Sequence, residues 1–142
     1  MSERTDSVRA VQRITASNNF AITASWVGRI IVLAATGDLD ISTTPLLTES
    51  LATAAADNPD GIVVDLTEVE FLATAGMSAL IRAHRRWASS ILVGVVAVGP
   101  ATARPMKLVG VDDIVAVYPN LEAATRDVAA ASTRRAVAVT VT

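Results

Sequence analysis

Short apolar runs of strand length alternate along this chain with stretches whose apolar residues recur at helical spacing. This alternation limits the possible folds more than any other feature. Gly61–Leu66 (GIVVDL) is rich in β-branched residues and bounded by turn residues, as in strands that a parallel sheet buries on both faces. A helix over about residues 76–88 is predicted by a stripe at i, i+3, i+4 and i+7 that holds Met77, Leu80, Ile81, His84 and, one turn on, Ala88. Strand followed by helix, repeated in this way, is typical of an α/β domain.

Further elements are expected on both sides of this unit. An alternating strand at 20–24 and a more buried one at 30–35 are joined by Val27-Gly28-Arg29, which suits a hairpin turn. The others are a helix capped by Thr44 that ends before Asn58-Pro59, a strand at 91–98, a short helix after Thr102 that Gly110 stops, a strand at 114–117, and a helix capped by Asn120.

The predicted order is therefore β-β-α-β-α-β-α-β-α. Right-handed crossovers should give a mostly parallel central sheet of about five strands, with an antiparallel N-terminal hairpin strand and about four helices. A length of 142 residues fits one domain, which we place at 19–131. Residues 1–18 are expected to form a flexible arm, and the tail 132–142 to be either disordered or an edge strand.

Composition excludes several classes of function. The chain has no cysteine, which removes disulfides, thiolate zinc sites and a cysteine nucleophile, and its net charge of −2 argues against a nucleic-acid binder. No apolar run approaches the about 18 residues of a membrane span, and the start lacks a signal peptide, so we expect a cytoplasmic protein without membrane contact. The one histidine, His84, lies on the apolar stripe of its helix, where a structural role is expected.

One end of the sheet is the only place where these residues suggest a site. The segment Ala73-Thr74-Ala75-Gly76 joins a strand to a helix and leaves backbone N–H groups open at the helix start. Asp38 and Asp40 follow the second strand and would lie beside this junction if the second and third strands are neighbours. Two carboxylates at i, i+2 in a loop usually form turn and cap hydrogen bonds, so we expect neither a metal nor a cofactor.

At these residues the sequence resembles a known family. Ile62–Leu80 (IVVDLTEVEFLATAGMSAL) is similar to the signature of STAS domains, specifically of bacterial anti-sigma factor antagonists. Gly37–Asp40 (GDLD) resembles the family's Gly-x-Leu-Asp loop, and Leu108–Ala124 resembles its closing helix, strand and helix. The resemblance covers about residues 19–130.

The resemblance implies a binding module rather than an enzyme. Such proteins dock on an anti-sigma factor, often a serine kinase, and so release a sigma factor for transcription. Phosphorylation of the second serine in Asp-Ser-Ser-Gly cancels docking. Here that motif is replaced by Ala73-Thr74-Ala75-Gly76, so the acceptor position is Ala75, which has no hydroxyl, while the loop acid Asp40 is kept.

Three interpretations remain open. The protein is an antagonist held in its binding-competent state, or an antagonist phosphorylated at Thr74 instead, or a scaffold or ligand-sensing STAS module outside sigma control, as in lipid-transport accessory proteins. Hydrolysis by Thr74 with Asp40 would need a general base and an oxyanion site that the residues do not indicate, so we expect no enzymatic activity and no small-molecule substrate.

The expected partner surface combines the exposed face of the helix with the two loops beside its start. Arg82, Arg85 and Arg86 would tune charge matching with the partner. Met77 could belong to this surface or to the core. The residues assigned to partner binding are Asp38, Asp40, Ser42, Thr43, Ala73, Thr74, Ala75, Gly76, Met77, Ser78 and Arg82.

Overall fold

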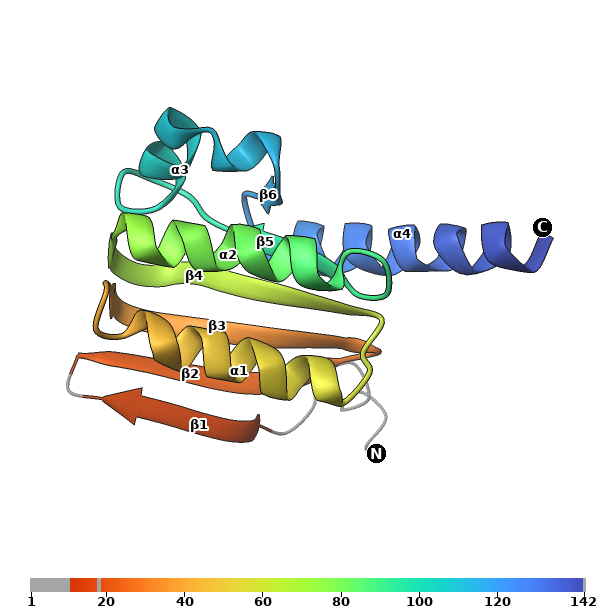
Figure 1. Cartoon of the computed structure of the whole chain (residues 1–142), viewed down its shortest axis with the longest axis horizontal. Coiled ribbons are helices and arrows are strands. Elements are labelled where there is room, and N and C mark those ends of the chain that lie inside the picture. The colour runs from red at the N-terminus through yellow and green to blue at the C-terminus, as the bar shows by residue number, and fades with distance from the viewer. Residues whose placement is uncertain (1–10, 18, 142) are drawn as a thin grey trace.

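A six-stranded sheet with helices on both faces forms the domain in the computed structural model, which describes residues 11–17 and 19–141 (Figure 1). The strands lie in the order β1-β2-β3-β4-β5-β6, and the β3/β4, β4/β5 and β5/β6 pairs are parallel. The predicted α/β class with an antiparallel N-terminal hairpin is confirmed. The elements are β1 (Val11–Ser17), β2 (Phe20–Val27), β3 (Ile30–Leu39), α1 (Thr44–Ala56), β4 (Gly61–Leu72), α2 (Thr74–Trp87), β5 (Leu92–Val96), α3 (Ala103–Val109), a 3-10 turn (Val111–Asp113), β6 (Ala116–Tyr118) and α4 (Leu121–Val141).

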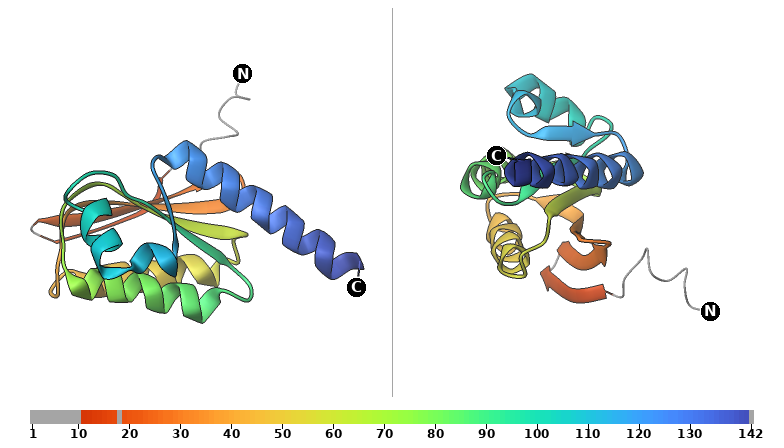
Figure 2. Two further views of the ribbon diagram at one scale, coloured as in Figure 1. Left: turned by 90° about the horizontal axis from the view of Figure 1, so that it is seen from above. Right: turned by 90° about the vertical axis from the view of Figure 1, so that its right-hand side faces the viewer.

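The sheet separates two apolar clusters of different size. Helices α1, α2 and α3 cover one face and α4 covers the other (Figure 2). Alternate residues of the central strands serve the two sides: Leu33 and Val64 belong to the large cluster under α1 and α2, and Val32 and Val63 to the small cluster under α4. This two-sided burial explains why the central strands are continuous apolar runs.

Strand β4 is longer than the sequence predicts. We expected it to end at Leu66 and a link to follow, but it runs to Leu72. Its parallel pairing with β3 continues past two irregularities in register, between Ala34 and Thr36 and between Gly37 and Asp38. Such bulges shift the in-and-out pattern of side chains, so the usual alternation of a strand is lost from the sequence.

The N-terminal strand corrects an expectation. Residues 11–17 were assigned to a flexible arm, yet they form β1 and pair antiparallel with β2. Ile14 is 68% exposed, and the sequence of this strand carries no apolar alternation to reveal it. Residues 1–10, the rest of the predicted arm, lie outside the described residues.

The C-terminal tail is a second correction. Residues 132–141 continue α4, so they are neither disordered nor an edge strand. No glycine or proline interrupts the helix, and the Nη2 of Arg135 donates a hydrogen bond of 2.9 Å to the carbonyl of Ala88. The start of α4 agrees with the prediction, because the Asn120 side chain accepts a hydrogen bond of 2.8 Å from the Ala123 amide.

Candidate functional site: a surface at the β3 tip and the α2 start

The ends of β3 and β4 bring the two predicted loops together. Leu39 and Leu72 are partners in the parallel register, and the Ala73 amide donates a hydrogen bond of 2.9 Å to the Leu39 carbonyl. The loop after Asp38 therefore lies beside the junction at Ala73-Thr74-Ala75-Gly76, as the sequence predicts for neighbouring strands.

Asp40 organises the loop between β3 and α1. Its carboxylate accepts hydrogen bonds from the Ser42 amide (3.0 Å), the Ser42 hydroxyl (2.8 Å) and the Thr43 amide (3.1 Å). The Ser42 hydroxyl, and then the Thr43 amide, hold the pKa of Asp40 below its ordinary value, because these bonds favour the ionised form. Asp38 accepts a bond of 3.3 Å from the Asn19 side chain. Asp40 therefore serves bonds within its own turn, whereas Asp38 bonds to the connection between β1 and β2.

Helix α1 begins at Thr44, one residue earlier than predicted, so its N-cap position is Thr43 rather than Thr44. The Thr43 hydroxyl donates to the Asp38 carbonyl at 2.8 Å, and the Thr44 hydroxyl donates to the Asp40 carbonyl at 2.6 Å. Thr43 is only 3% exposed. Its side chain therefore stabilises the loop from the protein interior. Thr43 is not exposed to a partner, although it was assigned to partner binding from the sequence.

The first turn of α2 packs tightly on the strand ends. A Cβ at Gly76 would lie 2.8 Å from Leu39 Cγ and 3.0 Å from Leu72 Cδ1, so glycine permits this close approach. Met77 is 4% exposed and belongs to the large apolar cluster. The open question about Met77 is thus settled in favour of the core, and Gly76 and Met77 are not available to a partner.

Ala75 lies at the surface of this junction. It is half-buried and lines a cavity of about 670 Å³ together with Ile41, Ser78 and Arg82. Thr74, one residue earlier, is exposed. The predicted residues that remain available to a partner are Asp38, Asp40, Ser42, Ala73, Thr74, Ala75, Ser78 and Arg82.

Two apolar side chains at this end were not predicted. Ile41 is 80% exposed in the Asp40 loop, and Phe71 is 53% exposed near the end of β4. Single exposed apolar side chains are common on protein surfaces, so Ile41 and Phe71 join the candidate surface by their position alone. The signal in the sequence was an isoleucine inside the polar stretch GDLDISTTP.

Other kinds of site find little support among residues 11–17 and 19–141. No three of their His, Asp and Glu side chains gather closely enough to hold a metal ion, and none of their helices is long and apolar enough to cross a membrane. His84 is half-buried, and its Nδ1 has no hydrogen-bond partner in this part of the chain.

Comparison with known proteins places these features in a wider group. The STAS domain family model matches residues 21–124. The anti-sigma-F factor antagonist RsfB of Mycobacterium tuberculosis is 32% identical over 108 residues, which cover 76% of this chain and 88% of RsfB.

Two solved structures show the same architecture. An anti-sigma factor antagonist from Mycobacterium paratuberculosis superposes with a TM-score of 0.75 at 32% identity, covering 80% of this chain and 97% of that one. A putative anti-sigma factor antagonist from Thermotoga maritima superposes with a TM-score of 0.69 at 18% identity, covering 75% of this chain and 93% of that one, which shows the fold alone.

Proposed function

Because this chain belongs to the STAS domain family, we propose that it is an anti-sigma factor antagonist, which binds an anti-sigma factor and so releases a sigma factor for transcription. The observation that carries the proposal is the position of Ala75, which is half-buried on an open cavity beside the exposed Thr74 and Ile41 rather than inside the core. A partner that covers the α2 start would rest directly on this methyl group. Such a partner acts in the cytoplasm, where we also place this protein.

A methyl group at this position has a consequence for regulation. A phosphate would add a charge of about −1.5 to −2, which a docked partner would have to desolvate. Ala75 cannot accept a phosphate, so we propose that the protein stays in its binding-competent form and that its partner is an anti-sigma factor of the serine-kinase type.

The local chemistry favours binding over catalysis. Asp40 is the acid that would act with Thr74 in a hydrolysis reaction, and its hydrogen bonds with Ser42 and Thr43 hold its pKa below its ordinary value. A carboxylate with a lowered pKa is a weak general base. We therefore propose no reaction at Thr74.

The decisive test is Ala75→Asp, with Ala130→Asp on the exposed side of α4 as the matched control. We expect the wild-type protein to bind one purified anti-sigma factor from its own organism in calorimetry. Ala75→Asp should weaken binding by about 30-fold or more, since an unpaired charge would be buried in the interface. Ala130→Asp should bind like the wild type. Equal affinity of Ala75→Asp and wild type would contradict the proposal, and capture of a lipid-transport ATPase instead would favour a scaffold outside sigma control.

Thr74 gives a second candidate for regulation, because its hydroxyl lies exposed in the first turn of α2. Incubation with the cognate kinase and ATP, followed by mass spectrometry, would find a phosphate on Thr74 and none on a Thr74→Val variant. An unmodified Thr74 after full turnover of a control substrate would remove this candidate.

A further inference from the structure

The cavity beside Ala75 adjoins another cavity along α1 and α2. This second cavity, of about 430 Å³, shares Thr48 and Arg82 with the first and ends at Trp87. We name these two adjoining cavities between α1 and α2 together the α1–α2 groove. It begins at the surface assigned above to the anti-sigma factor and runs away from it, toward the C-terminal end of α2.

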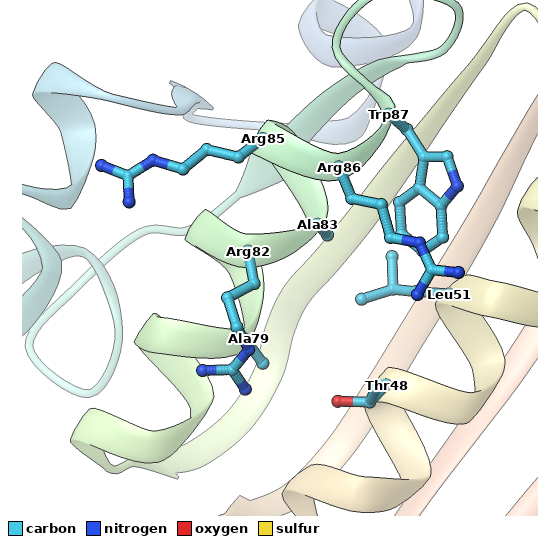
Figure 3. A pocket seen from close by; sticks show the side chains of 8 residues that line it. All are labelled: Thr48, Leu51, Ala79, Arg82, Ala83, Arg85, Arg86 and Trp87. Carbon is cyan, nitrogen blue, oxygen red and sulfur yellow. The ribbon is translucent and has the colours of Figure 1, made fainter.

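The floor of the groove is apolar and its α2 wall is basic. Leu51, Ala79 and Ala83 line the floor and are almost fully buried. The side chains of Arg82 and Arg86 extend on the side of α2 that faces α1 (Figure 3). Arg86 lies over the Trp87 ring, with its Cζ 5.0 Å from the ring centroid, which holds the guanidinium in place.

Neither arginine forms an ion pair with a described residue, although Glu49 of α1 lines the same cavity as Arg82. The ion pairs in the described part of the chain are Arg29–Asp60 and Arg126–Asp127, so no carboxylate there pairs with Arg82 or Arg86. The protein as a whole carries a net charge of −2, and the basic wall is therefore a local feature. Such a wall attracts an acidic group from another molecule.

We propose that the α1–α2 groove receives an acidic amphipathic helix of the anti-sigma factor, an inference that rests on the proposed function. Apolar side chains of that helix pack against Trp87 and Ile41 at the two ends of the groove, and its Asp or Glu side chains face Arg82 and Arg86. Helix α2 has 14 residues, so the groove is about 21 Å long and fits a helix of about four turns.

The geometry of the groove selects this occupant over two others. An added strand needs an open sheet edge, and the groove instead lies between two helices whose backbone groups are already bonded. A nucleic acid needs a broad basic surface, whereas here only two guanidinium groups face an apolar floor.

Charge reversal at the wall tests the inference, and the chain offers a matched control. Arg134 is this control, because it is exposed on α4, on the other face of the sheet. The Arg82→Glu/Arg86→Glu double variant should lose about tenfold or more in affinity for the anti-sigma factor and lose most of the salt dependence of binding. Arg134→Glu should change affinity by about twofold or less. Circular dichroism and melting curves check that all variants fold, and Arg82→Gln/Arg86→Gln is a milder second variant.

A crosslink identifies what lies in the groove. Because the chain has no cysteine, Thr48→Cys supplies a single attachment point for a benzophenone label at the middle of the groove. Mass spectrometry should find the label joined to a helical, acidic segment of the anti-sigma factor. Changing the acids of that segment to lysine should then restore binding by the Arg82→Glu/Arg86→Glu variant.

The outcomes separate this inference from the proposed function. If the double variant binds like the wild type while Ala75→Asp does not, the groove inference is wrong and the proposed function stands. If the wild-type protein binds no anti-sigma factor, both are wrong. A crosslink to a basic or extended segment would overturn the inference, as would a gel shift of a 20-nucleotide RNA by the wild type that the double variant abolishes.

Discussion

The carboxylate of Asp40 determines the shape of the loop that enters α1. The carboxylate accepts hydrogen bonds from the amides of Ser42 and Thr43, and the backbone carbonyl of Asp40 accepts one from the Thr44 hydroxyl. The loop therefore depends on the ionisation of this half-buried acid as well as on the buried Thr43 and Thr44. The folded-state pKa lies below the ordinary value, so the charged form of Asp40 stabilises the native state.

This linkage predicts how Asp40→Asn behaves with pH. The stabilisation by Asp40 is present above its unfolded-state pKa and is lost as the pH falls through its lower folded-state pKa. At pH near 7, Asp40→Asn should have a lower urea midpoint than the wild type, and the difference should shrink as the pH falls through the folded-state pKa of Asp40. Asp57→Asn, which removes a carboxylate without a hydrogen bond among the described residues, is the matched charge control. A difference that stays constant with pH would contradict the assignment.

At the scale of elements, the packing of α4 on the sheet depends on a close contact at Gly61 of β4, which leaves no room for a side chain at that position. A Cβ at Gly61 would lie 2.3 Å from Val128 Cγ1. Val128 is 4% exposed and belongs to the small cluster on that face of the sheet. The absence of a side chain at Gly61 thus determines how closely the helix approaches the sheet.

Paired substitutions test this contact. Gly61→Ala should destabilise the fold by about 1–3 kcal/mol through overpacking, and Val128→Ala by about 1–2 kcal/mol through lost burial. The double variant should lose at least about 1 kcal/mol less than the sum of the two, because the shorter side chain makes room for the added methyl group. Chemical denaturation of the four proteins measures the coupling. Strict additivity would show that the contact does not limit the approach of α4.

Elements that bury a regular face could be predicted from the sequence, and the others could not. The apolar run at 61–66 and the period of α2 gave the central strand–helix unit, whereas β1 has no apolar alternation and was missed. In the tail, Val137, Val139 and Val141 alternate like a strand, yet the backbone is helical there, since the helix continues from a well-capped start without a breaker.

The candidate site could likewise be predicted from the sequence only in part. The resemblance to a family motif located Ala75 and Asp40, but a motif does not show which side of a helix is buried. Only the structure shows that Thr43 and Met77 lie inside and that Ile41 lies outside. Burial of these residues depends on the register of β3 with β4, which is a long-range property.

At the scale of the whole molecule, the sheet keeps α4 away from the proposed partner surface. Helices α1 and α2 lie on one face and α4 on the other, and the C-terminal part of α4 extends beyond the sheet (Figures 1 and 2). Changes at the far end of α4 should therefore leave partner binding intact.

Truncation gives the corresponding prediction. Removal of residues 136–142 should leave both the melting temperature and the affinity for the anti-sigma factor nearly unchanged. Removal of 127–142 should lower the melting temperature strongly, because it deletes the buried Val128 and the Arg135 bond to Ala88. Thermal melts and calorimetry measure the two quantities. A large loss of affinity in the shorter truncation would show that the end of α4 reaches the partner.

The hydrogen bond from the Ala73 amide to the Leu39 carbonyl joins the two loops that a partner would touch. Because this bond is present in the free protein, the recognition surface is preorganised and needs no folding step when the partner binds. The conformational entropy lost on association would then fall on the partner alone. The heat-capacity change of complex formation should accordingly match the apolar area covered, with no added contribution from ordering this chain.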